Sequence, residues 1–130
     1  MSLNNTLANV LSFIQNYEQL GKSEVLTKNN SKLIRGILTI MKEEGYIGGF
    51  EEVPFSSGNM LKIMLTGNIN KTNIIRPNYQ IKLFEYEKFE KRYLPAKNFG
   101  IIIISTNKGL MTHNQAKENK LGGKLLAYCY

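Results

Sequence analysis

The sequence lacks most of the residues that catalytic and metal sites depend on. It has no aspartate, one histidine (His113) and one cysteine (Cys129). A zinc site uses about four ligands of these kinds, so the pair is more typical of a surface histidine and a strand cysteine. A single cysteine forms no intramolecular disulfide, which favours an intracellular protein. We therefore expect neither a metal ion nor any other cofactor.

Long hydrophobic runs are missing too. The longest aliphatic run, Ile101–Ile104, is far shorter than the roughly 20 apolar residues of a membrane helix. The N-terminus has no basic segment followed by an apolar one, so we expect no secretory signal. Apolar residues still make up 42% of the 130 residues, enough for a packed core. These features predict a folded cytoplasmic protein that does not insert into a membrane.

Positive charge is concentrated in the second half of the chain. Residues 1–66 carry six Lys/Arg and six Glu and are neutral. Residues 67–130 carry eleven Lys/Arg and four Glu, which accounts for the whole net charge of +7. This asymmetry indicates a scaffold half and a half that faces a polyanion, either nucleic acid or an anionic membrane. A basic surface that is merely solvated is the alternative.

Hydrophobic periodicity predicts an α+β protein with two small lobes. We expect an N-terminal α-β-α-β-β lobe at residues 1–68, with helices at 4–20 and 32–44 and strands at 24–27, 46–53 and 60–65. Ser31 suits the cap of the second helix and Gly45 the residue after its end. Pro54 to Asn59 is expected to be a turn, and the polar segment 67–77 a junction between lobes.

The C-terminal lobe, residues 69–130, is predicted to be β-rich with short helices. Strands are expected at 79–83, 99–106 and 124–130, and one or two helical turns at 85–93. The isoleucine run supports the second of these strands, because β-branched side chains pack well on a sheet. Thr112 and Gln115 have the spacing of a capping box, so a short helix should follow to about Lys120.

Catalytic motifs are poorly supported. Ser105 and His113 are close in sequence, but nucleophilic catalysis also needs an orienting group, and only Glu118 could provide one. A small hydrolase is an alternative that predicts turnover sensitive to Ser105→Ala. Gly122-Gly123-Lys124 is similar to part of a phosphate loop, yet Glu118 and Leu125 occupy positions that need Gly and Ser or Thr. We expect the protein not to be an enzyme.

Three clusters in the C-terminal half suit RNA. Ser105-Thr106-Asn107-Lys108-Gly109 offers small polar side chains and a glycine for close approach; an ordinary hairpin turn is the alternative. Gly122-Gly123-Lys124 could bring bare backbone and a cation to phosphate, or could simply end a helix. The third cluster interleaves Lys88, Lys91, Arg92 and Lys97 with Tyr86, Phe89 and Tyr93, whose rings could stack on bases or pack the core.

Several of these segments, in this order, resemble a known family. Phe99–His113, Ala116 and Gly122–Leu126 resemble the C-terminal signature of the universal small-subunit ribosomal protein S8, called fifteen-a in animals. Leu7–Leu11 with Ile14 and Asn16, Ser31–Leu33 and Lys42–Ile47 resemble its first helix, second helix and following strand. Leu94–Gly100 and the aromatic C-terminal strand resemble the eukaryotic and archaeal branch.

The resemblance implies a structural protein of the small (40S) ribosomal subunit. The C-terminal lobe would bind a stem in the central domain of small-subunit rRNA, help the cytosolic subunit to assemble, and lie among other small-subunit ribosomal proteins. The family's Ser-Thr-Ser run corresponds to Ser105, Thr106 and Asn107, the last being a departure. We expect RNA contacts from Arg76, Lys97, Ser105, Thr106, Asn107, Lys108, Gly109, Gly122, Gly123 and Lys124. A free-standing RNA-binding regulator that uses the same lobe is the alternative.

Overall fold

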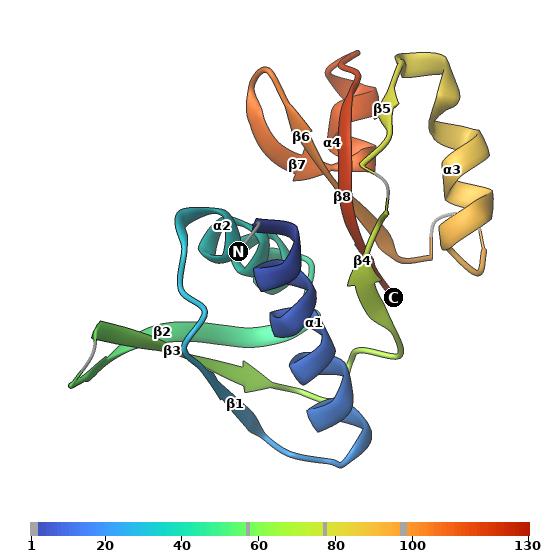
Figure 1. Cartoon of the computed structure of the whole chain (residues 1–130). Helices are drawn as coiled ribbons and strands as arrows, with labels where there is room; N and C mark the ends of the chain where they lie inside the picture. The colour runs from blue at the N-terminus through green and yellow to red at the C-terminus, as the bar shows by residue number, and fades with distance from the viewer. Residues whose placement is uncertain (1–2, 57, 77, 97–98) are drawn as a thin grey trace. The chain divides into compact units, whose positions relative to one another are not determined.

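The chain folds as two compact units that divide between Thr72 and Asn73. The computed structural model describes residues 3–56, 58–76, 78–96 and 99–130. Each unit combines helices with a β-sheet (Figure 1), which confirms the predicted α+β class. Within the described residues, no helix has the length and apolar character needed to span a membrane.

The N-terminal unit is a three-stranded antiparallel sheet with two helices. Its elements are α1 (Leu3–Gln19), β1 (Glu24–Thr27), α2 (Lys32–Glu43), β2 (Ile47–Phe55) and β3 (Gly58–Leu65). The strand order is β1-β3-β2, and Figure 1 shows both helices on the same side of this sheet. Alternate residues of β3, Leu61, Ile63 and Leu65, are buried, as a sheet covered on one face requires.

Helix α2 begins and ends as its sequence predicts. The Ser31 hydroxyl accepts a hydrogen bond from the Ile34 N–H at 3.2 Å, which satisfies one of the free donors of the first turn. After the helix, Gly45 has a φ of 82°, a conformation that glycine adopts without strain. One face of α2 enters the core through Ile34, Ile37, Leu38, Ile40 and Met41.

Strand β2 is longer than predicted, because it continues through Pro54 instead of turning there. Pro54 pairs with Asn59, and Phe55 pairs with Gly58. The prediction of a turn from Pro54 to Asn59 is therefore wrong at both of its ends, because Pro54 and Asn59 are paired strand residues. Proline lacks an N–H and is tolerated at the edge of a sheet, and β2 is an edge strand.

The polar segment after β3 is held by side chains of α1. The Glu18 carboxylate accepts hydrogen bonds from the N–H groups of Gly67 (3.1 Å) and Ile69 (2.9 Å). The Gln15 side chain accepts one from the Thr72 N–H at 3.1 Å. Here the chain forms the short strand β4 (Thr72–Ile74), which sequence periodicity did not predict.

The C-terminal unit has a second sheet flanked by short helices. Its elements are β5 (Gln80–Ile81), the 3₁₀ helix η1 (Leu83–Glu85), α3 (Tyr86–Tyr93), β6 (Ile101–Thr106), β7 (Gly109–Thr112), α4 (His113–Glu118) and β8 (Gly123–Cys129). The strand order is β4-β8-β6-β7, and β5 also pairs with β8. Strand β8 is therefore central, and it carries Cys129, as expected for a strand cysteine.

One apolar cluster fills this unit between the sheet and α3. Ile102 and Ile104 of β6 are fully buried in it, which confirms the strand predicted from the isoleucine run. The other buried members are Ile75, Ile81, Tyr86, Phe89, Leu94, Ala116, Leu125 and Tyr128. The capping box that starts α4 is also confirmed: the Gln115 N–H donates to Thr112 Oγ1 at 3.2 Å, and the Thr112 N–H donates to Gln115 Oε1 at 3.0 Å.

Candidate nucleic-acid interface

A row of side chains from four strands crosses one face of the C-terminal sheet. Ser105 of β6 pairs with Leu110 of β7 on one side and with Lys124 of β8 on the other, and Lys124 also pairs with Gln80 of β5. Directly paired residues project to the same face, with Cβ atoms about 4.5–5.5 Å apart. We call Gln80, Lys124 and Ser105 the polar row. The sequence placed Ser105 and Lys124 in separate clusters, and the register brings them side by side.

A β-bulge sets this register. The pairing of β6 with β8 steps from Ile103↔Ala127 to Ile104↔Leu125, which leaves Leu126 as an extra residue in β8. Bulges of this kind change the direction of the side chains that follow. Beyond the bulge, Ile104 and Leu125 both face the core, and Ser105 and Lys124 face the opposite side together.

Gly123 lets β8 lie close to β6 beside the row. A Cβ atom added to Gly123 would lie 2.4 Å from the Ser105 carbonyl oxygen and 2.8 Å from Ile104 Cγ2. Gly123 is buried, whereas Gly122 is exposed. A Cβ on Gly122 would lie 2.6 Å from the Ile81 carbonyl oxygen. Both glycines thus permit close backbone approach, and the approach seen is to neighbouring strands.

The loop after β6 is a tight hairpin that continues into β7. Thr106 pairs with Gly109, and Asn107 and Lys108 form the turn. The Thr106 hydroxyl donates to the Gly109 carbonyl at 2.9 Å and accepts from the Lys108 N–H at 3.1 Å. Gly109 has a φ of 110°, which a side chain would strain. The Thr106 hydroxyl therefore fixes the turn, and the small turn holds Asn107 and Lys108 at its exposed tip.

The hydroxyl of Ser105 and the side-chain amide of Asn107 have unused hydrogen-bonding capacity. Within the described part of the chain, neither group has a hydrogen-bond partner. Ser105 is half-buried at the sheet surface, whereas Asn107 and Lys108 are exposed. A hydroxyl can donate and accept, and so can an amide. Together with Lys124 they provide neutral hydrogen-bonding groups and positive charge, the combination suited to 2′-hydroxyl and phosphate groups.

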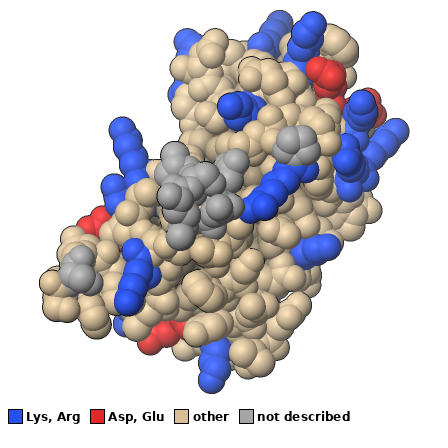
Figure 2. Space-filling model, in the orientation of Figure 1, with Lys and Arg blue, Asp and Glu red and all other residues tan. Residues whose placement is uncertain are grey.

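Arg76, another of the predicted RNA-binding residues, lies outside the polar row and the β6–β7 hairpin. Arg76 is exposed between β4 and β5 and already has an interaction within the protein. Lys97 lies outside the described residues. Figure 2 shows Lys and Arg side chains on both units of the face that it draws, with Glu side chains sparse between them. The face that Figure 2 draws is therefore mainly basic.

The aromatic residues of the third cluster mostly belong to the core. Tyr86 and Phe89 are only 1% and 4% exposed. The Tyr86 hydroxyl donates to the Leu121 carbonyl at 2.6 Å, and burial raises its pKa. The guanidinium of Arg92 lies over the rings of Tyr79 (5.4 Å) and Tyr93 (5.5 Å). Of the two interpretations of this cluster, core packing holds for Tyr86 and Phe89.

His113 is buried, so its prediction as a surface residue is wrong. It is 2% exposed at the start of α4. Its Nδ1 accepts a hydrogen bond from the Ile102 N–H at 3.1 Å, and its Nε2 lies 3.1 Å from Glu90 Oε1. Lys117 Nζ lies 2.5 Å from the same oxygen. Both ring nitrogens are thus occupied inside the protein, and neither is available as a base for Ser105.

Burial lowers the pKa of His113 below its usual value of 6.5, although the nearby Glu90 carboxylate opposes this change. The Ile102 hydrogen bond needs an unprotonated Nδ1, so the neutral ring is the form that this arrangement accommodates. Among the described residues, no group of three or more His, Cys, Asp or Glu side chains could hold a metal ion.

The geometry so far describes a basic α+β protein with a polar row suited to RNA. A family model described as Ribosomal protein S8 matches residues 5–130, nearly the whole chain. Proteins of this family are ribosomal proteins that bind rRNA, and their role is structural rather than catalytic. The match agrees with the order of segments noted in the sequence. The chain belongs to the ribosomal protein S8 family.

Proposed function

We propose that the C-terminal unit binds a stem in the central domain of small-subunit rRNA through the polar row and the β6–β7 hairpin. The single observation that supports this most strongly is the register that sets Ser105 beside Lys124. In this arrangement Ser105 and Gln80 reach 2′-hydroxyls or base edges, and Lys124 neutralises a phosphate. The shallow minor groove of an RNA helix offers these groups to short side chains.

The hairpin tip extends this surface. Asn107 takes the place of the serine usual in the family, and its amide can both donate and accept at a longer reach. Lys108 adds a second cation beside it. Gly109, free of a side chain, lets the RNA backbone approach the end of the hairpin. The Thr106 hydroxyl serves mainly to hold the turn.

Binding of this kind would give the protein a role in assembly. A protein that fixes one stem lowers the conformational entropy that the surrounding RNA still has to lose, so later ribosomal proteins bind a more ordered domain. We place this role in the small (40S) subunit of a cytosolic ribosome, of the eukaryotic or archaeal type suggested by Leu94–Gly100, where other small-subunit proteins are its neighbours. The N-terminal unit, nearly neutral in charge, serves as scaffold.

A competition titration tests the proposal. The full-length protein is titrated against a transcript of the central-domain stem from its own organism, with a shuffled stem of equal length as competitor, at two salt concentrations. Preference for the authentic stem that persists at the higher salt supports specific recognition, because non-specific phosphate binding falls steeply with salt. Equal binding to both stems would refute it. Co-sedimentation with small subunits separates a ribosomal constituent from a free-standing RNA-binding regulator.

A further inference from the structure

Phe84 is an unusually exposed aromatic residue of the C-terminal unit. It lies in η1 and is 81% exposed, and the preceding Leu83 is 41% exposed. Phe89 and Tyr86, which follow on α3, are buried. Exposed apolar side chains that lie side by side on a small protein often mark a contact surface.

The backbone that carries Phe84 is fixed at both ends. Before it, the Lys82 N–H donates to Glu85 Oε1 at 2.9 Å. After it, Tyr86 is anchored in the core by its hydroxyl bond to the Leu121 carbonyl. Because this backbone is already ordered, little conformational entropy is lost when the Phe84 ring binds a partner, and more of the contact energy contributes to affinity.

A groove of about 560 Å³ is lined in part by Phe84. Its apolar lining also includes Leu83, Leu94 and Pro95, and its charged lining includes Glu87 and Lys91. An aliphatic side chain placed here would cover the charged groups without replacing the hydrogen bonds that they make with water, which is unfavourable. A nucleobase has an apolar face for the ring and a polar edge for the ammonium and carboxylate groups. The mixed lining therefore suits a base better than an aliphatic anchor.

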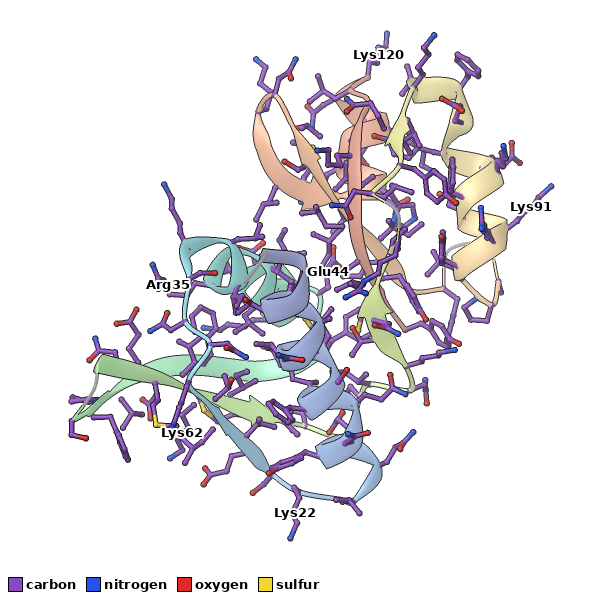
Figure 3. All side chains as sticks on the ribbon, in the orientation of Figure 1. Lys22, Arg35, Glu44, Lys62, Lys91 and Lys120 are labelled. Carbon is purple, nitrogen blue, oxygen red and sulfur yellow. The ribbon has the colours of Figure 1, made fainter. Side chains whose placement is uncertain are left out.

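The charges around the groove also favour RNA. Lys82, Lys88 and Lys91 are exposed on or beside η1 and α3, and Figure 3 shows Lys91 projecting outward from α3. Two of the nearby carboxylates are already engaged, Glu85 with the Lys82 N–H and Glu90 with His113 and Lys117. Glu87, in the groove lining, keeps its charge, but residues 82–92 together with Lys117 carry five Lys/Arg and three Glu. The net charge of this region is therefore +2, which favours an entering phosphate backbone.

We infer that Phe84 and this groove bind one unpaired nucleobase of rRNA, which stacks on the Phe84 ring while Lys82 and Lys88 contact the flanking phosphates. The inference rests on the rRNA binding of the family and not on the polar row. It adds a second RNA contact, to a single-stranded nucleotide, on a different part of the C-terminal unit. Stacking on an aromatic ring accepts any base, so this contact contributes affinity more than sequence selectivity.

A single-tryptophan variant provides the test. The chain has no tryptophan, so in the full-length Phe84→Trp protein all indole emission comes from this position. The protein is titrated with an eight-nucleotide unstructured oligoribonucleotide and, separately, with inorganic polyphosphate of equal charge. We expect quenching by the oligonucleotide and little by polyphosphate. Phe55→Trp is the matched control, because Phe55 is also exposed (58%) but lies on β2 in the N-terminal unit.

Affinity gives a second measure. Phe84→Ala should weaken binding to the oligonucleotide by about 5- to 150-fold, the range that corresponds to loss of one stacked base, and Phe84→Tyr should bind nearly as the parent does. A protein with Ser105→Ala and Lys124→Ala should keep the quenching of the Phe84→Trp indole when the three substitutions are combined, which separates this site from the polar row.

Several outcomes would overturn the inference. These are equal quenching by polyphosphate, no quenching, or an affinity change below about twofold for Phe84→Ala, where a stacked base should contribute far more. The inference would also be overturned if the indole emission of the Phe84→Trp protein did not change with RNA and changed only when a neighbouring ribosomal protein was added. The exposed ring would then mark a protein contact.

Discussion

Replacing Gly123 by alanine should show how much the proposed RNA-binding face depends on the packing of β8 against β6, because the substitution changes no charge. The added Cβ would lie 2.4 Å from the Ser105 carbonyl oxygen and 2.8 Å from Ile104 Cγ2. Non-bonded carbon atoms normally sit about 3.5–4.0 Å apart, so β8 must move from β6 by on the order of 1 Å. Gly123 does not have a positive φ, so the effect comes from this steric contact and not from backbone strain.

The Gly123→Ala substitution should lower both the free energy of unfolding and the affinity for the stem. Overpacking of this kind typically lowers the free energy of unfolding by about 1–3 kcal/mol, which a domain with about 5–15 kcal/mol of stability survives. A shift of on the order of 1 Å also exceeds the roughly 0.5 Å tolerance of a preorganised binding site. The displaced Lys124 and Ser105 should then bind the authentic stem about tenfold more weakly, a loss of about 1.4 kcal/mol, although neither side chain has been changed.

Urea denaturation measures the change in stability, and the stem titration measures the change in affinity. Gly48→Ala is the control, because its Cβ would approach Thr66 Cγ2 no closer than 3.2 Å and lies in the N-terminal unit. It should change stability little and stem binding not at all. If Gly123→Ala keeps both the parent's stability and its stem affinity, the glycine does not hold β8 against β6. If only stability falls, the polar row is not the RNA contact.

Three further predictions concern single side chains. Ser105→Ala should weaken stem binding by about 1–2 kcal/mol with unchanged stability, since its hydroxyl has no partner in the described protein; equal titration curves would contradict this. Lys124→Ala should reduce the slope of log K against log salt by about one phosphate contact, and an identical slope would exclude a contact. The pKa of His113 is lowered in the fold, so protonation favours unfolding: stability should be intact above pH 6.5 and fall by up to about 1.4 kcal/mol per pH unit below it. This pH dependence should be absent in His113→Gln, as measured by urea titration between pH 5 and pH 8 (about the range where histidine titrates).

Local sequence signals were sufficient to predict the elements whose stabilising contacts join residues close together in the chain. Ser31 and Gly45 at the ends of α2 act through contacts within four residues, and so does the Thr112–Gln115 capping box. The isoleucine run needed only its own residue types to predict β6. Such features can be read from a short window because their hydrogen bonds close within it.

The elements that were missed depend on distant partners. Strand β4 lies in an Asn-rich stretch with no strand pattern, and it exists because it pairs with β8 at the other end of this unit; just after it, the Ile75 N–H donates to the Leu126 carbonyl. His113 looked like a surface residue because histidine usually is one. Its burial depends on Ile102 and on Glu90, eleven and twenty-three residues earlier in the chain. No short window around His113 contains both partners.

The candidate site, too, was predicted in part from local composition, while the rest of it depends on how distant strands pair. Charge counting alone predicted that the C-terminal half faces a polyanion, and Ser105 and Lys124 were both named from local patterns. Their adjacency, and the addition of Gln80, required the pairing of β6, β8 and β5, including a bulge that nothing in the sequence of β8 marks. A shift of this register by one residue would point Lys124 into the core, where a cation without a partner is unfavourable. The lysine thus helps to select the register that in turn places it beside Ser105.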